Sequence, residues 1–292
     1  MSLTSFFFRL SVGRGDRKRD RAIPFPTGIM ECRNISYGNH KKWNLLDVYY
    51  PEGTTAPLPT LVSIHGGGFV YGTKEVYRRY CMSLAKRGFA VVNFNYRLAP
   101  EHRFPTPLED ANAVLEWVCR NANTYHLDPH RLFLVGDSAG AQITSQYAAI
   151  ASNPGYASLF DFTIPEITIK ALGLNCGLYD AAALASGKRK GIARDYLGPR
   201  LPATDPRLQV LAHITGNYPA AHITTAKDDF LRDNAQPMAD HLRSKGIPAE
   251  LVCYGMDGTK ELGHVFHVNI ALPEAQVCND DQCAFFRRCL NK

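Results

Sequence analysis

The chain has 292 residues, of which 45% are hydrophobic, and its formal net charge at pH 7 is +6. This length and composition suffice for one domain with a substantial core, and the sequence contains no run of about 18 apolar residues that could span a bilayer as a helix. Residues 9–21 contain six basic and two acidic side chains, so they supply +4 of the net charge. The rest of the chain therefore carries a net charge of only +2, which argues against a nucleic-acid partner.

The first 40 residues precede the first predicted strand and are rich in Arg, Gly and Pro. Residues 1–20 superficially resemble a signal peptide, but Arg9 interrupts the apolar part and no small-residue cleavage site follows, so we interpret them as mature chain. The basic residues at 9–21 are typical of a solvated segment, with contact to an anionic surface or an interface rim as alternatives. The eight cysteines lack metal-type spacing, which favours free thiols in a reducing cytoplasm and no metal site.

Short apolar or β-branched runs alternate with helical patterns along the chain. Strands are predicted at 45–50, 60–65, 90–95, 131–136, 169–176, 221–226 and 249–254, and helices at 75–87, 107–124, 138–152, 235–245 and 274–290. Such alternation predicts an α/β fold with a mainly parallel sheet that is covered by helices on both faces. Because no helix separates the first two strands, we expect an antiparallel edge.

A long segment rich in Gly and Pro, at about 178–217, interrupts this alternation. A long inserted segment at the carboxyl edge of a parallel sheet is well placed to cover a site at that edge. We therefore expect a catalytic domain at 41–292, interrupted by a cap insertion at about 178–217, with residues 1–40 contributing to the cap.

Three consecutive glycines, at positions 66–68, directly follow the predicted strand at 60–65. Their spacing matches neither the dinucleotide-binding fingerprint nor the P-loop, so phosphate binding is not favoured. A plain turn and a close backbone approach to another ligand remain as interpretations.

The segment Gly136-Asp137-Ser138-Ala139-Gly140 stands between a predicted strand and a predicted helix. This is the G-x-S-x-G pattern in the strand–turn–helix context that places a serine nucleophile on a sharp turn. The following helix would direct its N-terminus at the reacting centre. The pattern therefore predicts Ser138 as a nucleophile.

A serine hydroxyl needs a base, and the base needs an acid that holds it in one tautomer. In this type of sheet the acid and then the histidine follow the serine along the chain. The acid should leave the strand at 221–226, where Asp228, Asp229 and Asp233 are candidates, and His264 and His267 follow the last predicted strand. His241 lies in a helical segment and is expected at the surface.

The oxyanion that forms when serine attacks an ester carbonyl requires preorganised donors. Glycines present bare N–H groups because no side chain blocks their approach. We therefore expect the glycine loop and the N–H group of Ala139 to supply these donors.

Taken together, the motifs resemble those of the hormone-sensitive-lipase-like family of serine esterases, which have the α/β-hydrolase fold. The matching stretches are HGGGF at 65–69, NYRLAPEHRFPTPLEDA at 95–111, GDSAG at 136–140, DFLRD at 229–233 and GHVF at 263–266. They occur in the family's order and extend from about residue 44 to the end of the chain.

The resemblance implies a role for each matching position. It implies Ser138 as nucleophile, His264 as general base and acid, Asp229 as the triad acid with Asp228 as runner-up, and Gly67, Gly68 and Ala139 as oxyanion donors. It also implies a structural brace at Arg97 and Glu101, a shaping role for His65 in the glycine loop, and a supporting role for Asp137 at the turn.

The resemblance further implies a carboxylesterase that cleaves small-molecule esters with short acyl chains and needs no cofactor. Dimers are common among relatives, so a homodimer is among the expected assemblies. Alternatives with the same chemistry are a carbohydrate acetyl or feruloyl esterase, an amidase or a lipase. A non-catalytic small-molecule receptor is a more distant alternative, and the histidines at 264 and 267 argue against it.

Overall fold

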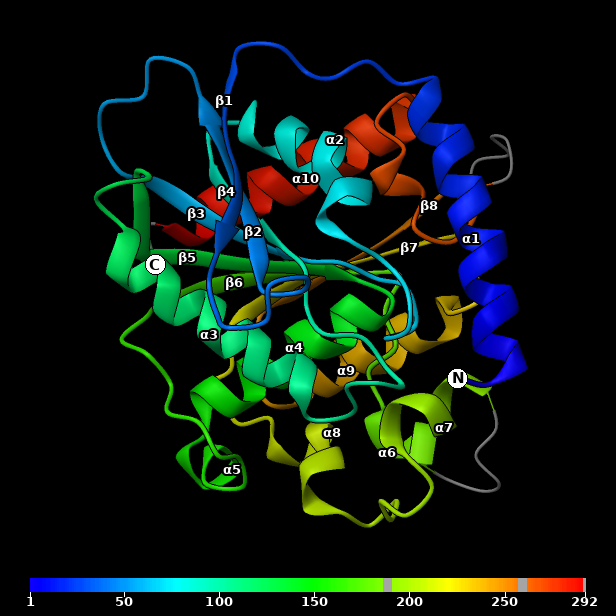
Figure 1. Ribbon diagram of the computed structural model, residues 1–292. Coiled ribbons are helices and arrows are strands. Elements are labelled where there is room, and N and C mark those ends of the chain that lie inside the picture. Colours follow the sequence, from blue (N-terminus) through cyan, green and yellow to red (C-terminus); the bar gives the residue numbers. More distant parts are fainter. Residues whose placement is uncertain (186–190, 257–261, 291–292) are drawn as a thin grey trace.

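A computed structural model describes residues 1–185, 191–256 and 262–290. Eight strands form one sheet in the order β1-β2-β4-β3-β5-β6-β7-β8 (Figure 1). The strands are β1 (Ile29–Ser36), β2 (Leu45–Pro51), β3 (Leu58–Ile64), β4 (Ala90–Phe94), β5 (Leu127–Asp137), β6 (Ile169–Asn175), β7 (Ala220–Ala226) and β8 (Ala249–Tyr254). Strand β2 is antiparallel to both β1 and β4, and the remaining pairs are parallel. The expected parallel sheet with an antiparallel edge is confirmed.

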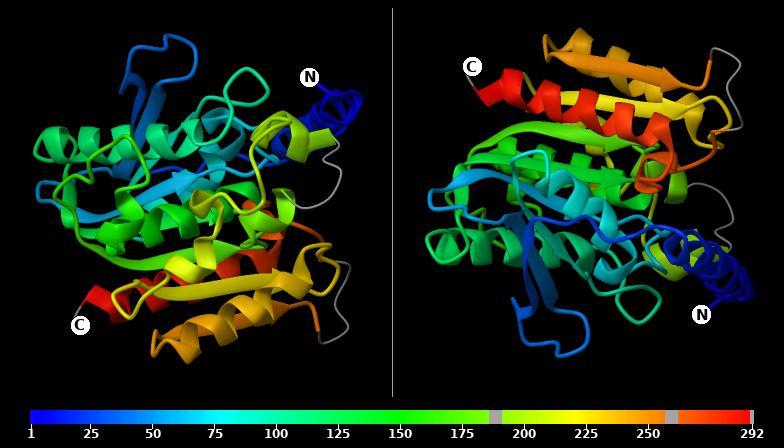
Figure 2. Two further views of the ribbon diagram at one scale, coloured as in Figure 1. Left: turned by 90° about the horizontal axis from the view of Figure 1, so that it is seen from below. Right: turned by 90° about the horizontal axis from the view of Figure 1, so that it is seen from above.

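Helices cover both faces of the sheet, as the two turned views show (Figure 2). Helices α2 (Lys74–Ala85) and α10 (Pro273–Leu290) cover one face, and α3 (Thr106–Asn121), α4 (Ala139–Ser152) and α9 (Ala235–Ser244) cover the other. Successive side chains along β5 point to opposite faces of the sheet and so contribute to two hydrophobic cores. Leu132 and Leu134 belong to one core, and Phe133 belongs to the other. The sheet therefore separates two hydrophobic layers.

Shorter elements complete the described chain. They are α5 (Pro154–Ala157), α6 (Ala181–Ala185), α7 (Gly191–Leu197), α8 (Val210–His213) and the 3₁₀ turns η1 (Pro206–Leu208), η2 (Arg232–Asn234) and η3 (Phe266–Val268). The expected cap insertion at 178–217 thus holds α6, α7, η1 and α8, and its residues 186–190 lie outside the described ranges.

The first 40 residues contain more regular structure than the sequence indicated. Strand β1 joins the sheet from Ile29 onward, ahead of the domain start expected at residue 41. Residues Leu3–Arg21 form a 19-residue helix, α1, although Gly13 and Gly15 disfavour helix. Ser2 caps this helix by accepting a hydrogen bond from the Ser5 N–H group at 3.2 Å.

Tertiary contacts hold α1 against the rest of the molecule. Arg9 donates hydrogen bonds to the carbonyl oxygens of Val70 and Ala99, at 2.5 and 2.7 Å. The Ser2 N–H and hydroxyl groups both donate to Asp195 of α7 at 2.8 Å. The helix consequently runs along the side of the molecule beside α7 (Figures 1 and 2). None of the helices in the described ranges is both long and apolar enough to cross a membrane.

Candidate active site

Ser138 occupies a sharp turn between the end of β5 and the start of α4. Its backbone has φ 53° and ψ −117°, a conformation that is unusual for a residue with a side chain. The close crossing of strand and helix requires glycine nearby, because a Cβ on Gly140 would lie 2.0 Å from the carbonyl oxygen of Ile64. The turn leaves Ser138 half-buried at the N-terminus of α4.

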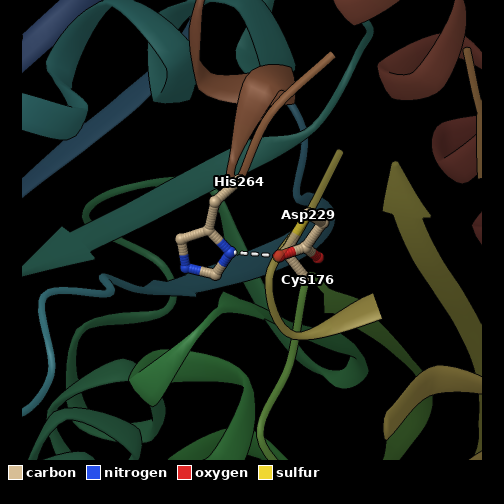
Figure 3. A group of neighbouring side chains, drawn as sticks. All are labelled: Cys176, Asp229 and His264. Atoms are coloured by element: carbon tan, nitrogen blue, oxygen red, sulfur yellow. Dashed lines mark hydrogen bonds and ion pairs between the residues drawn. The ribbon is translucent and has the colours of Figure 1, made fainter. Parts of the chain in front are cut away.

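Asp229 and His264 come together from the loops that follow β7 and β8 (Figure 3). The His264 Nδ1 atom lies 2.6 Å from Asp229 Oδ1. Two further donors fix the buried carboxylate: the Thr225 hydroxyl and the Leu231 N–H group, each at 2.9 Å. Burial alone would raise the pKa of Asp229, but the hydrogen bonds outweigh it and hold that pKa below its usual value. A charged Asp229 thus fixes the orientation of the imidazole.

The geometry distinguishes between the candidates that the sequence left open. Asp228 is exposed and, within the described ranges, forms no hydrogen bond or ion pair with either histidine, whereas Asp229 is 5% exposed and contacts His264. His267 is fully buried, neither of its ring nitrogens has a hydrogen-bond partner within the described ranges, and burial lowers its pKa to about 3. Asp233 lies in η2 and is exposed. The structure therefore brings together Asp229 and His264.

Cys176 lies against this pair, and its sulfur falls within 4.8 Å of the Asp229 and His264 ligand atoms (Figure 3). Burial raises the pKa of its thiol well above the usual value, so the sulfur stays protonated. A metal would need the thiolate and would have to displace the hydrogen bond between His264 and Asp229. The chemistry of these three residues therefore fits a proton-transfer pair better than a metal site.

Ser138 and His264 both line a cavity of about 420 Å³. Gly67, Gly68 and Ala139 border the same cavity. Most of its remaining wall is apolar and comes from α1, the 178–197 segment and the loop after β7, with Phe8, Val12, Leu178, Leu184, Ile192, Phe230 and Leu231. The cavity thus brings the predicted nucleophile, base and donor groups to one apolar space.

The glycine loop leaves two backbone donors free. The Gly66 N–H group donates to the Tyr77 hydroxyl at 3.0 Å, whereas those of Gly67 and Gly68 donate to no group in the described part of the chain. Gly67 has φ +112°, and a Cβ on it would lie 2.2 Å from the carbonyl oxygen of Tyr71. The N–H group of Ala139 is the first of α4 and has no acceptor within the helix. These three donors border one cavity.

Two buried groups support this loop from behind. The Tyr77 hydroxyl donates to Asp137 Oδ2 at 2.7 Å, and burial raises the pKa of Asp137 to about 6. The ring of His65 stacks on Tyr96 with centroids 4.1 Å apart, and its Nδ1 atom lies 2.8 Å from the carbonyl oxygen of Gly66. Burial lowers the pKa of His65 to about 4, so the neutral ring donates to this carbonyl. Both groups brace the loop.

The expected brace at Arg97 and Glu101 divides into two contacts. The guanidinium of Arg97 forms an ion pair with Asp110 of α3 at 2.8 Å. Glu101 is exposed and lies 3.7 Å from Arg9 of α1. Neither residue lines the cavity around Ser138.

Residues 1–40 were expected to contribute to the cap, but none of them was singled out as a residue that lines the cavity. Asp16 of α1 accepts hydrogen bonds from the Tyr71 hydroxyl at 2.8 Å and from Arg19 at 2.9 Å, and all three residues line the cavity. Tyr77 was missed as well. The sequence around this tyrosine, in a helical pattern, does not indicate its hydrogen-bond partner, because that partner is Asp137 at the end of β5.

Residues 61–268 match a family model described as an alpha/beta hydrolase fold. The chain is 32% identical over 264 residues to Esterase LipI of Mycobacterium tuberculosis, an alignment that covers 84% of this chain and 80% of LipI. It is also 32% identical over 216 residues to Carboxylesterase NlhH of the same species, covering 70% of this chain and 66% of NlhH.

Solved structures with the same architecture include esterase B from Lactobacillus Rhamnosis. The two chains superpose with a TM-score of 0.86 at 24% identity, over 96% of this chain and 92% of the other. A bacterial heroin esterase superposes with a TM-score of 0.77 at 23% identity, over 97% and 90% of the two chains. At these identities the likeness concerns the fold alone.

Proposed function

The chain belongs to the hormone-sensitive-lipase-like family of α/β-hydrolases, and from this premise we propose that it is a serine carboxylesterase for short-acyl esters. The observation that carries the proposal is the shared cavity of Ser138 and His264, with His264 bonded to the buried carboxylate of Asp229. Enzyme relatives are named esterases and carboxylesterases, which supports the reaction class.

Acylation begins when Ser138 Oγ attacks the ester carbonyl carbon. Because His264 Nδ1 donates to Asp229, its Nε2 atom is free to take the proton from the serine. The oxyanion accepts hydrogen bonds from the N–H groups of Gly67, Gly68 and Ala139. His264 then donates the proton to the leaving alkoxide, which departs as the alcohol and leaves an acyl ester on Ser138.

Deacylation repeats these steps with water as the nucleophile. His264 takes a proton from the water, the hydroxyl attacks the acyl carbonyl, and a second oxyanion forms at the same donors. The proton on His264 returns to Ser138 Oγ as the carboxylic acid leaves. Apart from the ester and the water molecule, the proposed half-reactions use only groups of this chain.

The preference for short acyl chains rests on the size and closure of the cavity. Its volume of about 420 Å³ is in the lower part of the range for small-molecule sites. The side chains of Ile192 in α7 and Phe8 in α1 both lie close to Gly68. Their nearest atoms are 3.2 and 3.6 Å from the position that a Cβ atom on Gly68 would occupy. We assign α1 and the 178–217 segment together as the cap that limits the length of the acyl chain. We also propose that the catalytic domain acts in the cytoplasm.

A chain-length series tests this proposal. The rates of hydrolysis of p-nitrophenyl esters from acetate to decanoate would be measured on the wild type and on Ser138→Ala. We expect a maximum at short chains and a loss of kcat on the order of 10⁶-fold in the variant. A maximum at decanoate would contradict the short-acyl assignment and favour a lipase. Ligand binding without turnover in the wild type would favour a receptor.

A further inference from the structure

Helix α1 presents two chemically different faces. Its inner face carries Phe8, Val12 and Asp16 into the wall of the cavity around Ser138. Its outer face carries side chains that are all exposed, namely Leu3, Phe6, Phe7, Leu10, Arg14, Arg17, Lys18 and Arg21. Since neighbouring members of this set are one, three or four residues apart, they follow one stripe along the helix. From residue 3 to residue 21 the stripe is about 27 Å long at 1.5 Å per residue. We call this set the outer stripe.

The N-terminal half of the outer stripe is apolar and uncovered. Leu3 is 77% exposed and Phe7 is 61% exposed, and Phe6 and Leu10 are also exposed. Together with Met1, these residues make up five of the ten large hydrophobic side chains that are exposed in the described ranges. A gathering of this kind in the first ten residues marks a contact surface, whereas single exposed apolar side chains are ordinary.

The C-terminal half of the outer stripe is cationic. The two acids of the helix, Asp16 and Asp20, both form ion pairs with Arg19. The four cations of the stripe form no ion pair with any residue in the described part of the chain, and they surround one open depression of the surface: Arg14, Arg17, Lys18 and Arg21. Both acidic residues of the helix therefore pair with a cation that is not part of the stripe, and the stripe keeps four positive charges.

We propose that the outer stripe docks the protein on an anionic lipid surface. Exposed aromatic and aliphatic side chains of a helix at a membrane surface enter the boundary between headgroups and acyl chains, and Lys and Arg bind anionic headgroups. Because the two halves follow each other along the axis, the N-terminal half of α1 inserts and the C-terminal half lies at headgroup level. This role extends beyond ester hydrolysis and does not depend on it.

A second copy of the chain satisfies the outer stripe less well. A symmetric contact brings the same patch of both copies together, so packing of the two apolar halves would leave both sets of cations without partners. A lipid surface satisfies both halves at once. Phe230, which is 74% exposed, is another exposed apolar side chain and borders the same cavity as the inner face of α1.

Vesicle co-sedimentation of the full-length protein tests this inference. Vesicles of phosphatidylcholine, with or without phosphatidylserine, would be compared at physiological salt. We expect the wild type to bind the anionic vesicles at least tenfold more strongly than the neutral ones. A double variant, Phe6→Ser with Phe7→Ser, and a second, Arg17→Gln with Lys18→Gln, should each weaken binding at least tenfold.

Matched controls place the same changes elsewhere on the surface. Val277→Ser in α10 removes another exposed apolar side chain, and Lys86→Gln with Lys245→Gln removes two exposed charges; these should leave binding unchanged. All variants should hydrolyse p-nitrophenyl acetate like the wild type, which shows that they are folded. Equal binding by stripe and control variants, or no binding by the wild type, would overturn the inference. A different result would assign the stripe to a second copy of the chain. In that case the wild type would self-associate without binding vesicles, and the Phe6 and Phe7 changes would abolish the self-association.

Discussion

Replacement of Asp229 by Asn probes the orientation of the imidazole most directly. The carboxylate accepts three hydrogen bonds, from His264 Nδ1 at 2.6 Å and from Thr225 and Leu231 at 2.9 Å each. Leu231 and His264 both donate to Oδ1, so an asparagine that keeps these two bonds places its amide N–H₂ group opposite Thr225. A neutral amide oxygen accepts a weaker hydrogen bond from Nδ1, so it orients the imidazole less firmly and does not stabilise the imidazolium that forms when His264 takes the proton of Ser138.

The size of the effect follows from the loss of the carboxylate charge opposite the imidazole. In serine hydrolases an Asp→Asn change of this kind lowers kcat about 10⁴-fold, which corresponds to roughly 5.4 kcal/mol of transition-state stabilisation. We expect the same order of loss for Asp229→Asn with p-nitrophenyl acetate as substrate. Initial rates at pH 7.5 give kcat and KM, and KM should change little because the substrate does not contact residue 229.

Asp228→Asn is the matched control, since the neighbouring carboxylate is exposed and should be replaceable with less than a twofold change in kcat. Circular dichroism and thermal melting of both variants show whether the fold is retained. If Asp229→Asn kept more than a tenth of the wild-type kcat while folded, or if Asp228→Asn lost as much activity, the assignment of the acid would be refuted.

Three further predictions concern the glycine loop, the core and pH. Gly67→Ala should lower kcat at least about 10²-fold, because a Cβ would collide with the carbonyl oxygen of Tyr71 at 2.2 Å and displace an oxyanion donor; kinetics with p-nitrophenyl acetate measure this. Lys74→Met should destabilise the fold by about 3–5 kcal/mol, because it removes the buried ammonium 2.9 Å from the carboxylate of Asp47 and leaves that carboxylate with the more distant guanidinium of Arg33, at 3.8 Å, as its cationic partner; urea unfolding measures this. Since burial lowers the pKa of His267 from 6.5 to about 3, unfolding takes up a proton below pH 6.5, and His267→Gln should reduce the loss of stability between pH 6.5 and 4; melting temperatures against pH measure this.

Each of these predictions has a control at an exposed position. Gly15→Ala meets no atom within 4 Å and should leave kcat unchanged. Lys86→Met and His130→Gln alter exposed side chains and should leave the unfolding free energy and its pH dependence unchanged. Unaltered kcat in Gly67→Ala, a loss below 1 kcal/mol in Lys74→Met, or an unaltered pH profile in His267→Gln would each contradict the reasoning given for that residue.

Most of the strands that sequence periodicity predicted are largely buried, and the exception is the edge strand β8, whose residues are half-buried or exposed. Every residue of β4 is buried, so its apolar run is unbroken, and β5 alternates between the two cores. Strand β1 escaped prediction because it is an edge strand that pairs only with β2 and buries Ile29 alone among its eight residues. An edge strand with a solvated surface needs no apolar alternation.

Helix α1 escaped prediction for a related reason. Its two glycines and its exposed Leu and Phe residues give no apolar stripe that faces the core. Contacts that no local pattern encodes hold it in place, such as those of Arg9 with the carbonyl oxygens of Val70 and Ala99. The sequence therefore predicted a part in the cap for residues 1–40, but neither the helix nor the residues of it that line the cavity.

The sequence by itself determined the order of the chemistry: a glycine loop after one strand, a serine on a turn after another, then acids and histidines after the last two. Those patterns are local, because each depends on a strand and the turn that follows it. Which acid meets which histidine was decided by tertiary structure. Asp228 and Asp229 are adjacent in the chain, yet only Asp229 turns into the interior toward His264. Successive side chains after a strand point in different directions, and only the packing of β7 beside β8 determines which one is buried.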